Sequence, residues 1–244
     1  MAERFGSLAY WAIGSLEETM PRDTFEKQVN DLKKTLLALG ALTTQTISDG
    51  TEALKTRDRV TAQSLIKQDI EINRMRYDIE ERAYRLIATQ QPLASDLREI
   101  MSILLIAIEL ERIADHSKNL AEIVIRMGDE PLLKPLIDIP RMAQLCESML
   151  GQALDAVARN DSELARAVCN RDEEIDQLYK QIFRELMTYV MEDSRTVTRA
   201  LNLLFAAHNL ERIGDRVTNI GERVIYAATG RLEELNVENH QMVE

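Results

Sequence analysis

The sequence predicts an all-α protein with two tandem three-helix bundles. Three observations lead to this fold class: a composition that favours helices, long segments between helix-breaking residues, and an internal repeat. Of the 244 residues, 45% are hydrophobic but only 5% are aromatic, and the chain has nine glycines and five prolines. Its interior must therefore be built mostly from aliphatic side chains and methionine, which favours helices over sheets.

Two segments of the chain repeat one another. Residues 109–122 read ELERIADHSKNLAE and residues 209–222 read NLERIGDRVTNIGE, so seven of fourteen positions are identical at an offset of 100. Further upstream, Asp58 corresponds to Asp161 at an offset of 103. The two halves of the chain are therefore expected to share one fold.

A proline-rich stretch separates the halves. Pro131, Pro135 and Pro140 follow Gly128 closely, and both residue types interrupt helices. We expect a domain boundary here and divide the chain into five segments: an N-terminal extension at 1–21, a first bundle at 22–128, a linker at 129–140, a second bundle at 141–230 and a C-terminal tail at 231–244.

The N-terminal extension contains an apolar, uncharged stretch at residues 5–16. Acidic residues at Glu3, Glu17 and Glu18 flank it and argue against a signal peptide, so we expect a weakly ordered extension or an amphipathic arm. The longest uncharged run, residues 35–48, has fourteen residues, whereas a bilayer-spanning helix needs about 20. We therefore expect no transmembrane helix.

Each half contains three segments that are long enough for a helix. They span 25–57, 60–90 and 93–127 in the first half, and 141–159, 162–191 and 195–229 in the second. Asp58 and Asp161 precede the middle segments, where their carboxylates would cap the first turn. Short connections make neighbouring helices antiparallel, so each half is expected to be an up-down-up bundle.

The third segment of each half shows the core-facing side most clearly. Apolar residues recur there at spacings of three, four and seven, which is the pattern of an amphipathic helix. We expect these residues in the core: Ile103, Ile106, Leu110, Ile113, Leu120 and Val124, with Leu203, Ala206, Leu210, Ile213, Ile220 and Val224.

The same two segments carry a row of oxygen-bearing side chains, spread over roughly 80° of the helix surface opposite the apolar stripe. The middle segments add further acidic or amide residues at a spacing of four, which an antiparallel bundle would bring towards the row. The candidate metal ligands are Glu111, Asp115, Asn119, Glu122, Asp69 and Asn73 in the first half, and Glu211, Asp215, Asn219, Glu222, Asp172 and Asp176 in the second.

Carboxylate and amide oxygens suit hard or borderline cations such as Mg²⁺, Mn²⁺, Ca²⁺ or iron. Zinc is disfavoured because no tetrahedral set of nitrogen and sulfur ligands is present. The alternative is a solvated ion-pair face, with Asp115 paired to Arg112, Asp215 to Arg212 and Glu122 to Arg126. The residues alone leave both interpretations open.

Other function classes receive little support. The chain has 30 basic and 41 acidic residues, a net charge of −11, so nucleic acid is not an expected partner. No phosphate-binding loop, nucleophile elbow or zinc-protease motif occurs, and catalysis has no evident residue. An acidic chain suggests cations or basic protein surfaces as partners instead, and a carboxylate-cluster metalloenzyme and a plain helical scaffold stay as alternatives.

At residues 22–230 the sequence resembles the PhoU family of phosphate-transport regulators. The family's E-x-x-x-D signature occurs twice, as ERIAD at 111–115 and ERIGD at 211–215, and QPLASDLR stands at 91–98. The resemblance implies two three-helix bundles that hold multinuclear clusters of iron or other divalent ions on their acidic faces. Ala114 replaces a glycine usual in the family, and Asn73 stands where Asp176 leads us to expect an aspartate, so we expect a weaker first-half site.

The resemblance also implies a function. Members of the family are cytoplasmic, usually dimeric regulators that link the ATPase subunit of the high-affinity phosphate transporter to a sensor histidine kinase. They keep the phosphate-starvation response off when phosphate is plentiful, and they contact the membrane only through these partners. We expect the same negative regulation here, without catalysis.

Overall fold

The computed structural model describes residues 21–235, so all but the last residue of the predicted extension at 1–21, and most of the predicted tail, lie outside the described residues. The described part is helical and contains no strand. Its helices are α1 Pro21–Thr56, α2 Arg59–Gln90, α3 Ala94–Met127, α4 Asp138–Arg159, α5 Ser162–Cys169, α6 Asp172–Glu192 and α7 Val197–Thr229, with a 3₁₀ turn, η1, at Ser194–Thr196. The predicted all-α class is confirmed.

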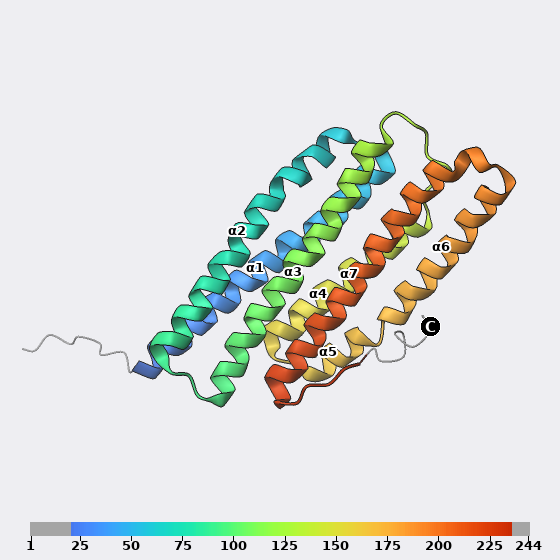
Figure 1. The fold of residues 1–244 in the computed structure, drawn as a ribbon. Coiled ribbons are helices and arrows are strands. Elements are labelled where there is room, and N and C mark those ends of the chain that lie inside the picture. The colour runs from blue at the N-terminus through green and yellow to red at the C-terminus, as the bar shows by residue number, and fades with distance from the viewer. Residues whose placement is uncertain (1–20, 236–244) are drawn as a thin grey trace, which may run out of the picture.

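The helices form two three-helix bundles side by side (Figure 1). α1, α2 and α3 make the first, and α4, the α5–α6 pair and α7 make the second. α3 and α7 pack against each other along their length and run in opposite directions, while α1 packs on α4 behind them. α2 and α6 lie at the two outer edges.

Both predicted aspartate caps are present. Asp58 accepts hydrogen bonds from the backbone N–H groups of Val60 and Thr61, and Asp161 accepts from those of Glu163 and Leu164. Each carboxylate satisfies donors that the first helical turn leaves without a partner. These caps fix where the middle helix of each bundle begins.

The middle helix of the second bundle is interrupted, so the prediction of one continuous helix over 162–191 is wrong. α5 ends at Cys169, and the Arg171 N–H donates to the Val168 carbonyl at 3.0 Å, a tighter turn than an α-helix makes. A new helix begins at Asp172, where three successive acidic residues face the positive end of the helix dipole. Asparagine at position 170, a weak helix former, lies in the turn.

A single hydrophobic core extends through both bundles. Every residue of the predicted third-helix stripe is buried, with at most 3% of its surface exposed. The proline-rich segment therefore connects two halves that share one interior rather than two separate cores. Within residues 21–235, no helix is both long and apolar enough to cross a membrane.

Candidate functional site

The predicted acidic row does not form one site, because its members face different neighbours. Glu111 and Asp115 face the α2 side, and Glu211 and Asp215 face the α6 side. The four remaining members of the row lie elsewhere. We call the two resulting groups the first cluster (Asp69, Glu111, Asp115) and the second cluster (Asp176, Glu211, Asp215).

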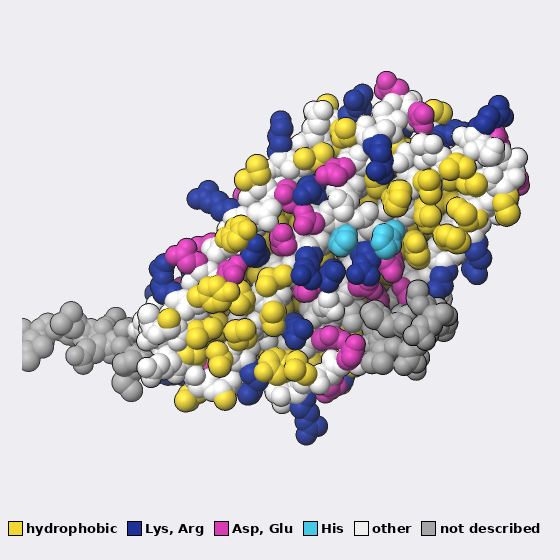
Figure 2. Space-filling model, viewed as in Figure 1, with side chains coloured by type: hydrophobic (Ala, Val, Ile, Leu, Met, Phe, Trp, Pro, Cys, Tyr) yellow, Lys and Arg dark blue, Asp and Glu magenta, His cyan; other side chains and the backbone are white. Residues whose placement is uncertain are grey.

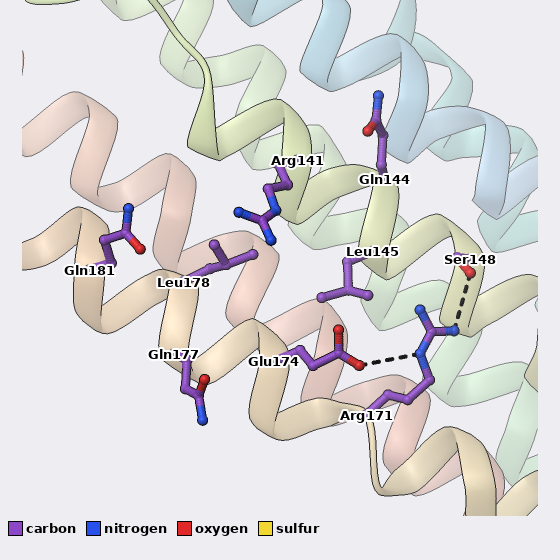
Figure 3. Close-up of a pocket in the computed structure, with 9 residues that line it drawn as sticks. All are labelled: Arg141, Gln144, Leu145, Ser148, Arg171, Glu174, Gln177, Leu178 and Gln181. Carbon is purple, nitrogen blue, oxygen red and sulfur yellow. Dashed lines mark hydrogen bonds and ion pairs between the residues drawn. The ribbon is translucent and has the colours of Figure 1, made fainter.

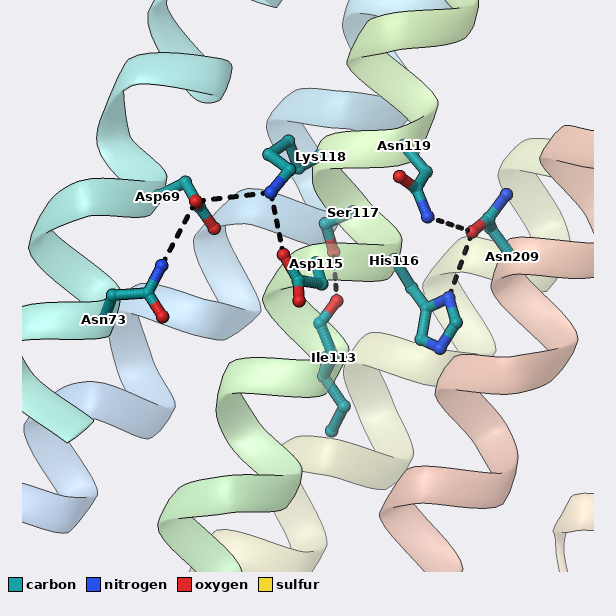
Figure 4. A network of polar contacts seen from close by, with 9 residues as sticks. All are labelled: Asp69, Asn73, Ile113, Asp115, His116, Ser117, Lys118, Asn119 and Asn209. Carbon is teal, nitrogen blue, oxygen red and sulfur yellow. Dashed lines mark hydrogen bonds and ion pairs between the residues drawn. The ribbon is translucent and has the colours of Figure 1, made fainter. Parts of the chain in front are cut away.

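A lysine lies within the first cluster. Lys118 Nζ lies 2.8 Å from Asp115 Oδ1 and 3.2 Å from Asp69 Oδ2, and so bridges α3 and α2 (Figure 4). Asn73 donates its side-chain amide to Asp69 Oδ2 at 3.1 Å. Burial raises the pKa of Glu111, and the charges of Asp115 and Asp69 raise it further, while Arg76 opposes them. This cluster contains its own counter-cation.

The cations beside the second cluster come from its own helices, Arg212 on α7 and Lys180 on α6. Burial raises the pKa of Glu211 to about 7, and the charges of Asp215 and Asp176 add to this effect. Burial also raises the pKa of Asp176; Lys180 opposes that shift and Asp215 reinforces it. Arg212 pairs with Asp215 at 2.8 Å, as the ion-pair interpretation predicted.

The repeat explains the difference between the clusters. Lys118 corresponds to Thr218 at the offset of 100, and Arg76 corresponds to Tyr179 at the offset of 103. Thr218 is buried and donates its hydroxyl to the Gly214 carbonyl at 3.4 Å. Two positions that are cationic beside the first cluster are thus neutral beside the second.

Asn119 and Asn219 point into the seam between α3 and α7 rather than towards the clusters. Asn119 Nδ2 donates to Asn209 Oδ1 at 2.9 Å, and Asn219 Nδ2 donates to Glu109 Oε2 at 3.2 Å. His116 Nδ1 lies 3.0 Å from the same Asn209 oxygen (Figure 4). Burial lowers the pKa of His116, which favours the neutral form of its ring.

The other predicted ligands are also apart from the clusters. Asp172 is 2% exposed and packs at the start of α6, where its charge helps to raise the pKa of both buried cysteines, Cys146 and Cys169, after burial itself. Glu122 is exposed, and Glu222 accepts a hydrogen bond from the Leu235 N–H at 3.0 Å.

Sequence reasoning missed the polar residues of this seam. Arg216 lies 3.5 Å from Glu109 Oε2, beside the bond from Asn219. Position 109 therefore contacts positions 216 and 219, while position 209 contacts positions 116 and 119. The offset of 100 relates these contacts to each other, so the repeat itself contained the signal.

Carboxylate oxygens are donor atoms that hard cations prefer, and both clusters contain them. Among residues 21–235, no three His, Cys, Asp or Glu side chains are arranged as a ready-made metal site. The second cluster nevertheless gathers carboxylates that raise one another's pKa, which a bound cation would relieve. In the first cluster the Lys118 ammonium already supplies a positive charge.

A groove lies between α4 and α6 (Figure 3). It has a volume of about 460 Å³ and is lined mostly by arginine and glutamine side chains. Its one carboxylate, Glu174, lies 3.6 Å from Arg171, which also donates to Ser148 and Gln152. The groove can accept polar groups, but it offers no acid–base pair for catalysis.

Comparison with known proteins identifies the family. A family model described as the PhoU domain matches twice, at residues 36–124 and 139–224. The phosphate-specific transport system accessory protein PhoU homolog of Rhizobium meliloti is 41% identical over 207 residues, which cover 84% of this chain and 87% of that protein. The protein of the same name from Clostridium acetobutylicum is 38% identical over 218 residues, covering 89% of this chain and 100% of that protein.

Two solved structures of PhoU proteins are similar to this chain in fold and sequence. The crystal structure of PhoU from Pseudomonas aeruginosa has a TM-score of 0.81 at 39% identity and covers 85% of this chain and 100% of that chain. A phosphate transport system regulatory protein PhoU from Streptococcus pneumoniae has a TM-score of 0.81 at 32% identity, covering 86% of this chain and 100% of that chain. The chain therefore belongs to the PhoU family, whose members are accessory and regulatory proteins of phosphate transport and not enzymes.

Proposed function

We propose that this protein is a negative regulator of phosphate uptake and of the phosphate-starvation response. It acts as an adaptor between the ATPase subunit of a phosphate transporter and a sensor histidine kinase. Family membership over both repeats supports this role. In this proposal the protein works in the cytoplasm as a homodimer and meets the membrane only through its partners.

The proposal includes a metal ion, with the second cluster as the preferred site. The candidate ions are iron, Mn²⁺, Mg²⁺ and Ca²⁺, which accept carboxylate oxygens, and several ions can share such a cluster. The observation that carries this step is the replacement of Lys118 and Arg76 by Thr218 and Tyr179 in the second repeat. Arg212 pairs with Asp215 there, and a bound cation would add a second positive charge near the position that Lys118 occupies in the first repeat.

Metal occupancy gives the adaptor a way to change its surface. Hydrophobic side chains gather over α6 and α7, the two helices that carry the second cluster (Figure 2). Phe183 of α6 and Leu201 and Phe205 of α7 are exposed. A cation bound at the cluster would lower the negative charge next to these side chains. Partner surfaces with apolar and charged groups would then bind with an affinity that depends on the metal.

Metal content of purified protein tests the site. We compare wild type with Glu211→Gln/Asp215→Asn and with the matched first-cluster variant Glu111→Gln/Asp115→Asn, after dialysis without chelator. We expect the second-cluster variant to lose most bound metal and the first-cluster variant to retain most of it. Equal loss in both variants would contradict the asymmetry, and metal-free wild type would contradict the metal site.

Regulation in cells tests the adaptor role separately. A strain with the second-cluster variant should express phosphate-starvation genes in phosphate-rich medium, whereas the first-cluster variant should repress them. Repression by both variants, at normal protein levels, would show that the second cluster does not carry the signal. Pull-down of the transporter ATPase and of the kinase, with and without chelator, then identifies which contact depends on metal.

A further inference from the structure

An exposed apolar patch covers the end of the first bundle where the described chain begins. Hydrophobic side chains gather over the C-terminal half of α2 and the N-terminal half of α3 (Figure 2). On α3 the members stand four residues apart and therefore share one side of the helix. We define the α2–α3 patch by Tyr84, Ile87, Leu97, Met101 and Leu105.

The patch is solvent-accessible although it is apolar. Tyr84 is 54% exposed and Leu97 is 38% exposed, while Ile87 and Met101 are partly buried against the core. Leu93, at the turn between the two helices, is 71% exposed. Contiguous apolar surface of this kind gains free energy when another apolar segment covers it.

The start of α1 lies beside this patch. Arg22 pairs with Asp96 at 2.6 Å, which ties the first turn of α1 to the first turn of α3. A hollow of about 230 Å³ opens at the same place, lined in part by Phe25, Pro92 and Leu93. The start of α1 at Pro21 therefore lies at the same end of the first bundle as Leu97.

We propose that residues 5–16 of this chain cover the α2–α3 patch. This stretch is uncharged and includes six large apolar residues, Phe5, Leu8, Tyr10, Trp11, Ile13 and Leu16. The stretch is tethered only a few residues from the patch. Its effective concentration at the patch is therefore roughly millimolar or higher. Docking within one chain is then favoured over capture of a second molecule.

The reach of the tether distinguishes this patch from its counterpart in the second repeat. Trp11 stands ten residues before Pro21 and can lie at most roughly 35 Å from it. The counterpart of Leu97 at the offset of 100 is Val197, the first residue of α7. Gly230, just after the last residue of α7, lies against Arg98 of α3. Val197 therefore lies at the end of α7 that is distant from Leu97. A helix of this length spans roughly 50 Å, so Trp11 reaches the first patch and not the second.

Trp11 is the only tryptophan of the chain, so its fluorescence reports on this segment alone. We compare the emission maximum and the acrylamide quenching of wild type with those of Leu97→Gln/Met101→Gln. The matched control is Val197→Gln/Leu201→Gln, which changes the equivalent positions of the second repeat; Val197 and Leu201 are 37% and 40% exposed. Circular dichroism confirms that each variant is folded.

We expect wild-type Trp11 to emit at short wavelength, and its quenching to rise several-fold in the first variant but not in the control. A wild-type emission typical of free tryptophan in water would overturn the proposal without any variant. An equal change in both variants would overturn it too. Emission that shifts to the red on dilution would assign the segment to the patch of a second copy instead.

Discussion

At α7, Gly214 and Gly221 determine how closely the neighbouring helices approach. A Cβ atom at Gly221 would lie 2.4 Å from Cys169 Sγ and 3.3 Å from the Ala165 carbonyl oxygen. A Cβ atom at Gly214 would lie 2.6 Å from Asp172 Oδ1. The first repeat has alanine at both equivalent positions, Ala114 and Ala121, so this close approach belongs to the second repeat.

Gly221→Ala should therefore destabilise the protein. The added methyl group must displace the end of α5, and overpacking of this kind costs about 1 to 3 kcal/mol of unfolding free energy. The control is Gly151→Ala in α4, where a Cβ atom would meet nothing within 4 Å and the gain in helix propensity stabilises by up to about 1 kcal/mol. Urea unfolding of both variants measures the difference, and an unchanged midpoint for Gly221→Ala would contradict the packing.

Glu211 should make stability depend on pH in metal-free protein. Its pKa rises from 4.5 to about 7 on folding, so the folded state holds the proton more strongly. This contribution is complete below about pH 4.5 and is lost as the pH rises through about 7. At pH 8 in the presence of chelator, Glu211→Gln should be more stable than wild type by about 2 kcal/mol.

The control for this measurement is Glu192→Gln, which changes an exposed glutamate near the end of α6. It should leave the pH dependence of the unfolding free energy as it is in wild type. A Glu211→Gln protein that loses stability with rising pH as steeply as wild type would show that burial of Glu211 is not the cause.

At the scale of single elements, most helices could be predicted from the sequence. Periodic apolar residues and the caps at Asp58 and Asp161 place the elements, because each is a local signal within one helix. The start of α1 at Pro21 lies four residues before the predicted 25, where the apolar period does not yet show. The interruption at Asn170 could not be predicted, since it depends on how α5 and α6 pack on α7.

The site could be predicted only in part. The spacing of four brings Glu111 close to Asp115 and Glu211 close to Asp215, while their role as metal ligands stays a prediction. Helical periodicity predicts on which side of a helix a residue lies, but not which other helix packs against that side. The position of Asn119 in the seam was therefore not predicted. The role of Lys118 also depends on α2, which brings Asp69 to it.

The seam between α3 and α7 should show energetic coupling. Glu109 is paired with Arg216 on one side, whereas Asn209 and His116 make the equivalent neutral contact on the other. Arg216→His or Glu109→Asn alone leaves a partly buried charge with a poorer partner and should cost about 1 to 3 kcal/mol. The double variant copies the neutral contact and should cost less than the sum of the two. Additive losses in urea unfolding would argue against coupling across the seam.

At the scale of the whole molecule, the shared core predicts one unfolding transition. The interior is continuous across both bundles, so neither bundle has a core of its own to retain. Ile113→Ala and Ile213→Ala remove fully buried side chains at equivalent positions and should each cost about 2 to 5 kcal/mol. Calorimetry should show one peak that moves in both variants. Two peaks, each sensitive to one variant, would instead support independent domains.

The reciprocal contacts of the seam bear on the origin of the chain. Position 109 meets 216 and 219, and position 209 meets 116 and 119, so each repeat touches the other with the same surface. Such reciprocity defines an isologous interface, the kind that joins two identical subunits about a twofold axis. The contact between α3 and α7 therefore has the form of an ancestral dimer interface made permanent by gene duplication and fusion. In a fused chain the two halves can differ at equivalent positions, as Lys118 and Thr218 do.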